Sequence, residues 1–157
     1  METENKKSVY ICGPLTELSP QEQQEVKSFY AKLADVCKDV TGIRAFVPHE
    51  HYDPVQHAYY TPAQVDAAER KQVSEQTSLL LVVTTAPSWG GGIEVEIANT
   101  SSIPVIILCE RMKLEQRRIS RLLRGNPAVV SIIPYDTEEE VFEKLQKELK
   151  THIGAPV

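Results

Sequence analysis

The sequence predicts an α/β fold, in which a doubly wound five-stranded parallel sheet carries helices on both faces. Short apolar runs alternate with segments of helical periodicity along the chain, and such alternation is typical of parallel sheets covered by helices. The apolar runs are nearly continuous, as expected for strands buried on both faces. The 157 residues contain no repeat and no long linker, so a single domain over residues 1–157 is expected.

Five segments rich in Val, Ile and Leu are the predicted strands, and five helical segments follow them. The strands are Val9–Cys12, Arg44–Val47, Leu79–Thr84, Val105–Cys109 and Val129–Ile133. The helices are Pro20–Asp39, Pro62–Gln76, Gly91–Thr100, Leu114–Leu123 and Glu138–Leu149. This order of elements is typical of Rossmann-like and flavodoxin-like sheets.

Two of the predicted helices have clear N-terminal signals. Thr61 precedes Pro62, and Gln64 completes a T-x-x-Q capping box, in which side chains satisfy free backbone N–H groups. The last helix begins after Thr137 with three glutamates, which the positive end of a helix dipole favours. These signals support helix starts at residues 62 and 138.

The composition is that of an ordinary globular protein with an acidic balance. A formal net charge of −5 gives no reason to expect a nucleic-acid or membrane-surface partner. No apolar run approaches the ~20 residues of a membrane span, and the polar stretch METENKKS lacks the apolar core of a signal peptide. Three cysteines, of which Cys12 and Cys109 stand in apolar runs, are expected to be reduced core residues of a cytoplasmic protein.

The first three predicted strands are expected to end at one edge of the sheet. Ligands of doubly wound folds bind at the carboxyl ends of the strands, near the point where strand order reverses. Residues 12–16, 48–51 and 86–94 meet there, and each segment carries glycines or polar side chains. The sequence therefore predicts a binding pocket at this edge.

The stretch PSWGGGIEVEIA (residues 87–98) holds three consecutive glycines before Glu94 and Glu96. At about 100° per residue, the inward face of this helix includes Ile93 and Glu94, whereas Glu96 faces solvent and Val95 fits neither side. Two interpretations of Glu94 stay open. It forms a salt bridge or caps its own helix, or it is a reactive or ligand-binding carboxylate beside the space that the glycines leave.

The common phosphate-binding motifs do not fit this stretch. A P-loop requires a lysine that is absent here, and a dinucleotide fingerprint requires a third glycine where Val95 stands after Gly90 and Gly92. A carboxylate next to an electrophilic sugar carbon, in contrast, can act as a nucleophile or stabilise positive charge. No cofactor is expected.

Two segments, YICGPL near the N-terminus and PSWGGGIEVEIA, resemble the nucleoside 2-deoxyribosyltransferase superfamily, most closely its nucleoside 5′-monophosphate N-glycosidase branch. That branch includes 2′-deoxynucleoside 5′-monophosphate N-hydrolases and CMP N-glycosidases. The resemblance extends from about Tyr10 to Arg124. It implies a homodimer, with the active site near the interface, that acts on a small nucleotide or nucleoside.

The resemblance also implies roles for individual residues. Glu94 matches the glutamate that attacks the anomeric carbon, and Tyr10 matches a tyrosine whose hydroxyl lies near it. Ser88 matches a serine that binds the 5′-phosphate, and Ser120 one that reaches this phosphate across the dimer interface. The further residues expected to contact substrate are Cys12, Gly13, Thr16, His49, Trp89, Gly90 and Gly92.

The sequence departs from the family pattern in two places. Pro14 and Thr16 stand in the first loop where the monophosphate hydrolases have a serine and an arginine, so the strongest phosphate clamp is missing. Counting back from Ser88 places Arg70 where the family has an acid near the leaving base. Asp66 and Glu69 are the nearest acids and are the predicted catalytic candidates, with His49 and water as alternatives.

Other side chains have competing interpretations. The H-x-H-x5-H pattern around His49 matches no standard metal signature, so no metal site is expected. Arg117, Arg121 and Arg124 share one face of the predicted helix, either as a solvated basic surface or for phosphate capture that replaces the missing arginine. Trp89 either stacks on a base or packs into a subunit interface.

The expected activity is hydrolysis of the N-glycosidic bond of a nucleoside or deoxynucleoside 5′-monophosphate, which releases the free base and a sugar 5-phosphate. Two alternatives belong to other classes. Capture of the same intermediate by a second base would make the protein a deoxyribosyltransferase, and binding without turnover would make it a nucleotide sensor.

Overall fold

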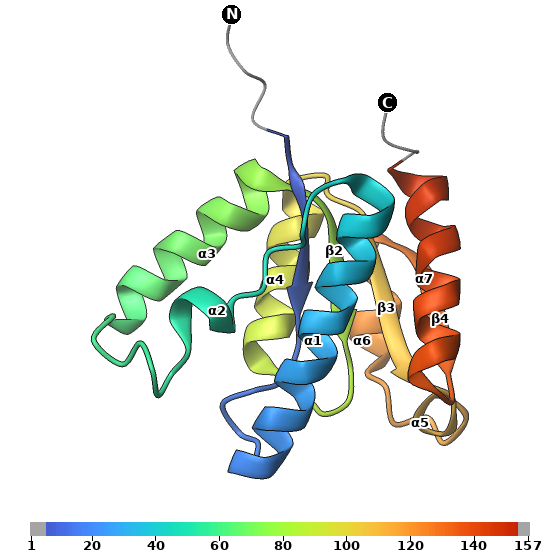
Figure 1. Cartoon of the computed structure of the whole chain (residues 1–157), viewed down its shortest axis with the longest axis horizontal. Coiled ribbons are helices and arrows are strands. Elements are labelled where there is room, and N and C mark those ends of the chain that lie inside the picture. Colours follow the sequence, from blue (N-terminus) through green and yellow to red (C-terminus); the bar gives the residue numbers. More distant parts are fainter. Residues whose placement is uncertain (1–5, 154–157) are drawn as a thin grey trace, which may run out of the picture.

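A computed structural model describes residues 6–153, which form an α/β sandwich around one parallel sheet (Figure 1). The strands are β1 (Ser8–Cys12), β2 (Thr77–Val83), β3 (Val105–Glu110) and β4 (Val129–Tyr135), in the spatial order β1-β2-β3-β4. All neighbouring pairs are parallel. The predicted Rossmann-like parallel sheet is therefore confirmed, and four of its predicted strands lie within two residues of their predicted limits. The limits expected for the domain, at residues 1 and 157, lie outside the described residues.

The predicted count of five strands is not confirmed. Arg44–Val47 forms a single parallel bridge, between Phe46 and Tyr10 of β1, with backbone hydrogen bonds of 2.8 and 3.0 Å on its two sides. Pro48 follows at once, has no N–H to donate, and leads into the short helix α2 (His49–Tyr52). The segment runs along the β1 edge but ends before a ladder can form.

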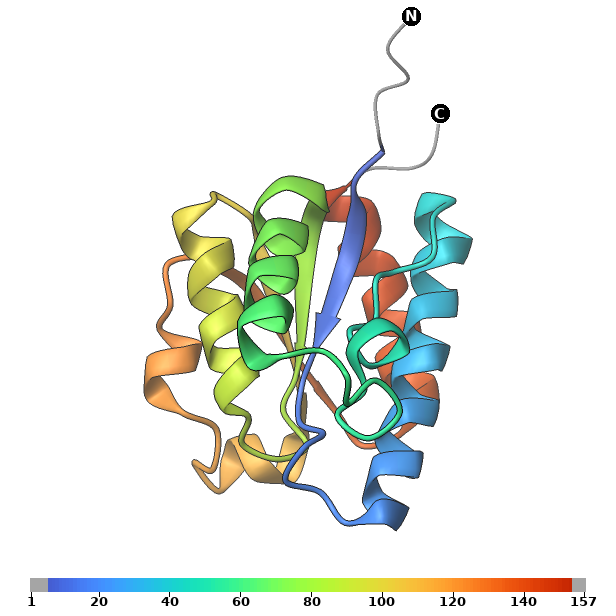
Figure 2. The same ribbon diagram turned by 90° about the vertical axis from the view of Figure 1, so that its left-hand side faces the viewer.

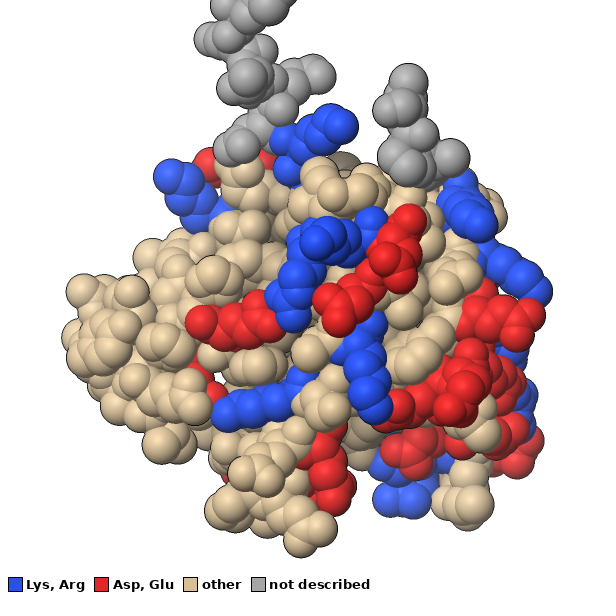
Figure 3. All heavy atoms as spheres, in the orientation of Figure 1, with Lys and Arg blue, Asp and Glu red and all other residues tan. Residues whose placement is uncertain are grey.

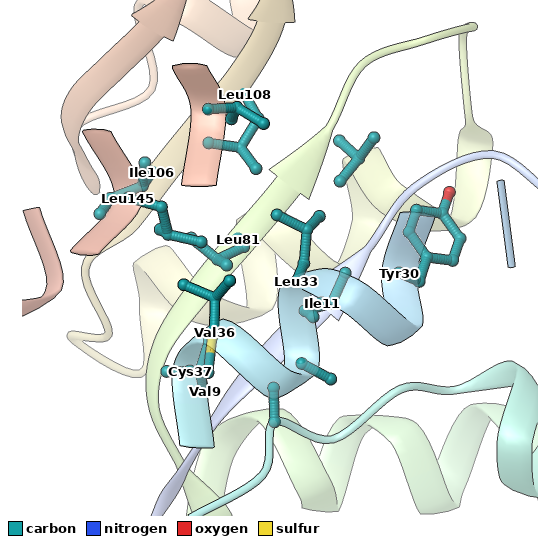
Figure 4. Packing of buried hydrophobic residues seen from close by; sticks show 14 of the residues in the cluster. Val9, Ile11, Tyr30, Leu33, Val36, Cys37, Leu81, Ile106, Leu108 and Leu145 are labelled. Carbon is teal, nitrogen blue, oxygen red and sulfur yellow. The ribbon is translucent and has the colours of Figure 1, made fainter. Parts of the chain in front are cut away.

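Helices cover both faces of the sheet, as predicted (Figure 2). Helices α1 (Pro20–Thr41) and α7 (Glu138–His152) pack together on one face, and α3 (Pro62–Gln76) and α4 (Trp89–Thr100) on the other. Alternate residues of each strand face the two sides, so the sheet separates two apolar clusters. Figure 4 shows the cluster on the α1–α7 side of the sheet, which includes Leu33 of α1, Leu145 of α7 and Leu81 of β2.

The helix starts follow local capping chemistry. Thr61 and Gln64 form the predicted capping box at the start of α3, and Ser19 and Glu22 form a second one at the start of α1. Helix α4 begins at Trp89, two residues earlier than predicted, because the side chain of its N-cap residue Ser88 accepts a hydrogen bond from a first-turn N–H.

The helix predicted at Leu114–Leu123 is wrong. Two short helices replace it, α5 (Arg111–Glu115) and α6 (Arg121–Arg124). Arg117 has a left-handed φ of 58°. The N–H groups of Arg117 and Arg118 donate back to carbonyls of α5 at 3.1 and 2.8 Å, a pairing that ends a helix. Within residues 6–153, no helix is long and apolar enough to span a bilayer.

Candidate active site

A pocket of about 1210 Å³ lies at the carboxyl ends of β1 and β2, the sheet edge where the sequence predicts it. Its walls are the loop after β1, helix α2 with the loop that follows, the first half of α3, and the turn into α4. The chain turns outward from β1 to Arg44–Val47 and then returns to β2 on the other side, so the winding reverses beside β1. Such reversal points are where open α/β sheets bind ligands.

Glu94 lies in this pocket with its side chain only 7% exposed. The hydroxyl of Tyr10, a fully buried residue of β1, donates a hydrogen bond of 2.5 Å to Glu94 Oε1. Glu96, two residues further along α4, is exposed and accepts a hydrogen bond of 2.9 Å from Asn126. The predicted inward orientation of Glu94 and outward orientation of Glu96 are therefore confirmed. Among residues 6–153, no cation forms a salt bridge with Glu94.

The surroundings of Glu94 favour its protonated form. Burial raises the pKa of Glu94 to about 8 and the negative charge of Glu69 adds to this, while hydrogen bonds from Tyr10 and Cys12 act in the opposite direction. Burial and the neighbouring Glu94 raise the pKa of the Cys12 thiol well above its usual value. Cys12 therefore lines the pocket as a neutral thiol that donates to the carboxyl group.

The structure distinguishes the two predicted acid candidates on α3. Glu69 is half-buried and lines the pocket, and burial together with the charge of Asp66 raises its pKa to about 7. Asp66 is exposed at the rim and accepts a hydrogen bond of 2.8 Å from Arg70 Nε. Glu69 is therefore the carboxyl group that interacts with Glu94, and Asp66 is held in a surface ion pair.

Ser88 connects the turn into α4 with the loop after β1. Its Oγ accepts a hydrogen bond of 3.0 Å from Gly91 N–H and donates one of 3.4 Å to the carbonyl of Gly13. A Cβ at Gly13 would collide with the hydroxyl of Tyr30 and lie 2.9 Å from the carbonyl oxygen of Val83. Only glycine fits at residue 13, so the first loop can approach the start of α4 closely.

Two of the three glycines of the turn into α4, Gly90 and Gly92, face open space. A Cβ added at Gly90 or Gly92 would meet no atom within 4 Å. Gly90 lines the pocket, whereas Gly92 lies outside its lining, so the structure does not bring Gly92 to the predicted substrate site. The space that these two residues leave is not filled by the protein itself.

Two large apolar side chains stand exposed at the pocket rim. Trp89 is 93% exposed and Ile93 is 49% exposed, and both line the pocket. The predicted inward position of Ile93 is therefore wrong. The start of α4 extends over the pocket mouth, so a side chain directed there meets the pocket instead of the core.

The three histidines of the H-x-H-x5-H pattern, His49, His51 and His57, have different surroundings. His49 lines the pocket, and its buried Nε2 has no hydrogen-bond partner within the described part of the chain. Burial lowers the pKa of His49, so the ring is neutral. His51 stacks on Phe46 at 4.6 Å, and His57 Nδ1 accepts a hydrogen bond of 3.0 Å from Asp53 N–H. Within residues 6–153, no group of three or more His, Cys, Asp or Glu side chains could hold a metal ion.

One wall of the pocket is formed by residues that are not among the predicted site residues. Tyr52 and Tyr60 line it from α2 and the following loop, and their rings meet edge to face at 5.3 Å. Buried Asp53 fixes the loop, because its carboxylate binds Lys27 of α1 at 2.5 Å and accepts two backbone N–H groups. Figure 3 shows few charges on the left of the molecule, where this loop lies. The sequence signal is the aromatic density of HYDPVQHAYY.

The predicted phosphate ligands do not all meet in one chain. Thr16 and Ser88 line the pocket. Ser120 lines a separate hollow of about 580 Å³, which shares no residue with the pocket. Among the residues that line the pocket, Arg70 is the one Lys or Arg, and it is paired with Asp66.

No protein-family model and no curated protein matches the chain. Solved structures do. A CMP N-glycosidase, BcmB, from Clostridium botulinum has a TM-score of 0.64 and 22% identity, covering 91% of this chain and 100% of that one. A conserved protein of Enterococcus faecalis V583 has a TM-score of 0.62 and 18% identity over 92% of this chain and 99% of that one.

The solution structure of BlsM is also similar, with a TM-score of 0.63 and 17% identity over 98% of this chain and 97% of that one. All three likenesses extend over nearly the full length of both chains. They establish a shared α/β fold.

Proposed function

We propose that this chain is a single catalytic domain that hydrolyses the N-glycosidic bond of a nucleoside 5′-monophosphate. The observation that carries the proposal is the buried Glu94, which receives the Tyr10 hydroxyl at 2.5 Å inside a pocket that also holds Glu69. A glycoside hydrolase of the retaining type typically uses two such carboxyl groups, one as nucleophile and one as acid and base. The similar structure of a CMP N-glycosidase supports the choice of a nucleotide.

Glu94 acts as the nucleophile in this proposal. One carboxylate oxygen bonds to the anomeric carbon while the C–N bond breaks and its electrons go to the base. Glu69 gives its proton to the departing base. Glu69 then takes a proton from a water molecule, whose oxygen attacks the same carbon and breaks the ester bond to Glu94. The products are the free base and a sugar 5-phosphate, and both carboxyl groups return to their starting states.

The 5′-phosphate is placed at the start of α4. Backbone N–H groups at a helix N-terminus, together with the helix dipole, favour an anion. Ser88 and Gly90 line the pocket there, and Thr16 reaches it from the first loop. The base then occupies the α3 side, where Glu69 can reach it and Tyr52 and Tyr60 form a wall. His49 Nε2 and Trp89 are further contacts to substrate in this proposal.

We infer a homodimer whose second copy covers the rim formed by Trp89 and Ile93 and brings Ser120 towards the pocket of the first. The reaction requires no cofactor or metal ion. Exchange of one base for another is the second candidate reaction, because the glycosyl ester on Glu94 is common to both and only the acceptor differs.

The test is a chromatographic screen for free base. Ribo- and deoxyribonucleoside 5′-monophosphates and the matching nucleosides are incubated with the wild type, with Glu94→Ala, and with Glu96→Ala as the matched control on the same helix. We expect base release from a monophosphate, a loss of roughly 10³-fold or more in Glu94→Ala, and no loss in Glu96→Ala. Addition of a second base separates the two reactions, since exchange with little free sugar indicates transfer.

Two outcomes would overturn the glycosidase. Equal release by the wild type and Glu94→Ala would remove Glu94 from the chemistry. Binding of a nucleotide without release from any compound, at high protein concentration, would leave a nucleotide sensor.

A further inference from the structure

The α3 wall of the pocket carries a guanidinium group whose outer edge is unused. Arg70 lines the pocket, and its Nε donates to the two carboxylate oxygens of Asp66 at 3.0 and 2.8 Å. Among residues 6–153, the terminal groups Nη1 and Nη2 of Arg70 make no hydrogen bond. Because Asp66 holds the Nε edge of the planar group, the Nη1–Nη2 edge presents a fork of two N–H donors.

The charges of this wall suit a neutral ligand group better than a phosphate. The Asp66 carboxylate balances the charge of Arg70 at 2.8 Å, and the carboxyl group of Glu69 lines the same wall. A doubly charged phosphate placed here would approach Asp66, and like charges at close range repel. A neutral group that accepts hydrogen bonds meets the two donors of Arg70 without this repulsion.

Arg70 also lies on the side of the pocket where the proposed function places the base. Glu69 and Arg70 are consecutive residues of α3, and both line the pocket. In the proposed reaction Glu69 gives its proton to the departing base, whereas the phosphate lies at the start of α4. The donor fork of Arg70 is therefore next to the base and away from the phosphate.

We propose that Arg70 selects the base, so that the pocket takes a nucleoside 5′-monophosphate whose base has two adjacent hydrogen-bond acceptors. This inference rests on the proposed function. Guanine offers O6 and N7, the pair that arginine most often binds in a bidentate manner, and cytosine offers O2 and N3. Adenine has an amino donor beside N7, and uracil has an N–H donor between its two oxygens. Each of these two bases therefore turns a donor towards the donor fork of Arg70.

The same contacts assist the departure of the base. As the C–N bond breaks, its electron pair moves into the ring of the base and onto the acceptor atoms that Arg70 contacts. Two N–H groups of a guanidinium stabilise this negative charge until the proton of Glu69 arrives. Arg70 is therefore expected to affect kcat/KM as well as the affinity for the nucleotide.

The test is a calorimetric titration of Glu94→Ala, which removes the proposed nucleophile, with CMP, UMP, GMP and AMP. Affinities are compared within one ring size, CMP against UMP and GMP against AMP, so that the volume of the base does not contribute. We expect a preference of roughly tenfold or more for CMP or for GMP within its pair, and the pair that shows it identifies the base. Adding Arg70→Gln should abolish the preference. Adding Lys71→Gln should keep it, because this exposed lysine follows Arg70 on α3 but does not line the pocket.

Equal affinities within both pairs, or a preference that survives in Arg70→Gln, would overturn the proposal. An equal loss of affinity for all four nucleotides and for inorganic phosphate would also overturn it, because Arg70 would then bind the phosphate. If Arg70→Gln proves unfolded by circular dichroism, Arg70→Lys replaces it with the same expectation. Lysine keeps the positive charge but lacks the planar fork.

Steady-state kinetics separate this proposal from the proposed function. In an active protein, Arg70→Gln should lower kcat/KM for the preferred monophosphate by roughly tenfold or more and change that of its disfavoured pair member much less. A preference in the titration that depends on Arg70, without release of base from any compound, would support the role of Arg70 and contradict the glycosidase. Release of base with the same preference in the wild type and Arg70→Gln would do the reverse.

Discussion

Glu94 and Glu69 have opposite requirements in the proposed reaction. The nucleophile must be ionised and the acid must be protonated, so the pair has to carry one proton between them. Burial raises the pKa of Glu94 to about 8 and that of Glu69 to about 7. Both values belong to one interacting pair, whose singly protonated form contains the productive arrangement. The Tyr10 hydroxyl favours this arrangement, because it donates to the ionised form of Glu94.

The rate of base release should therefore have a bell-shaped pH profile. We expect kcat/KM to rise as the pair loses its first proton and to fall as it loses the second, with a maximum between pH 7 and pH 8. In Glu69→Gln, the negative charge that raises the pKa of Glu94 is gone. The acidic limb should move to lower pH, the basic limb should disappear, and the rate should fall by about 10²-fold. An unchanged basic limb in Glu69→Gln would assign the acid to another group.

The buried carboxyl group of Glu94 also makes the stability of the folded protein depend on pH. The pKa of Glu94 is about 8 in the folded chain against a usual value of 4.5, so its contribution to stability is complete below about pH 4.5 and is lost as pH rises through 8. Glu94→Gln should remove this loss and raise the free energy of unfolding at pH 9 by up to about 5 kcal/mol. Urea unfolding at pH 5 and pH 9 measures it, with Glu96→Gln as the exposed control. If the free energy of unfolding changed equally between pH 5 and pH 9 in the wild type, Glu94→Gln and Glu96→Gln, burial would not disfavour the ionised form of Glu94.

At the scale of elements, the first turn of α4 combines weak helix formation with open space. Gly90 and Gly92 both leave room for a methyl group, but only Gly90 lines the pocket. Gly90→Ala and Gly92→Ala should each stabilise the protein by up to about 1 kcal/mol, because alanine is the better helix former. Only Gly90→Ala should raise KM for the monophosphate. Thermal unfolding and steady-state kinetics check both effects, and an equal rise in KM for the two variants would contradict the assigned lining.

The sequence predicts those parts of the fold and site that depend on local pattern. The inward position of Glu94 is predicted by the helical period, although Ile93, predicted inward with it, is exposed, and Val95, predicted to fit neither face, is buried. The capping box of Thr61 and Gln64 follows from four adjacent residues. The break between α5 and α6 at Arg117 is not predicted by any local pattern. No glycine marks its left-handed backbone, and the flanking residues are good helix formers. The choice of Glu69 over Asp66 depends on how α3 packs against α4, since both acids lie on the same helix.

Tertiary context also explains the two remaining differences. Arg44–Val47 has the composition of a strand, but the number of bridges depends on how far the chain follows β1 before Pro48. The wall of Tyr52 and Tyr60 depends on the contact between Asp53 and Lys27, which joins a loop to a distant helix. No periodic pattern in the sequence predicts such a contact.

At the scale of the whole molecule, an apolar surface remains uncovered around the pocket mouth. Trp89 and Ile93 of α4 are exposed at this mouth, and Leu122 of α6, which does not line the pocket, is 87% exposed. Asn126, just after α6, donates to Glu96 of α4 at 2.9 Å, so the two helices are neighbours. Exposed apolar groups of this size are typical of interaction surfaces.

We expect this surface to lie in a dimer interface. Sedimentation should show a dimer for the wild type and a marked shift to monomer for Trp89→Ser/Leu122→Ser, because most of the apolar contact is lost. Val55→Ser is the control, because Val55 is another exposed apolar residue (74% exposed), and this variant should remain dimeric. A monomeric wild type at all concentrations would contradict the homodimer.

The hydrogen bond between Tyr10 and Glu94 joins residues 84 positions apart in the chain. Tyr10 belongs to β1, whose neighbour β2 starts only at Thr77, and its hydrogen-bond partner Glu94 comes later still. During synthesis, an emerging chain therefore holds its first strand without a ladder partner until more than half of the protein has been made. The pair of Tyr10 and Glu94 cannot form before residue 94 has been made, so chains that end before Glu94 lack this hydrogen bond.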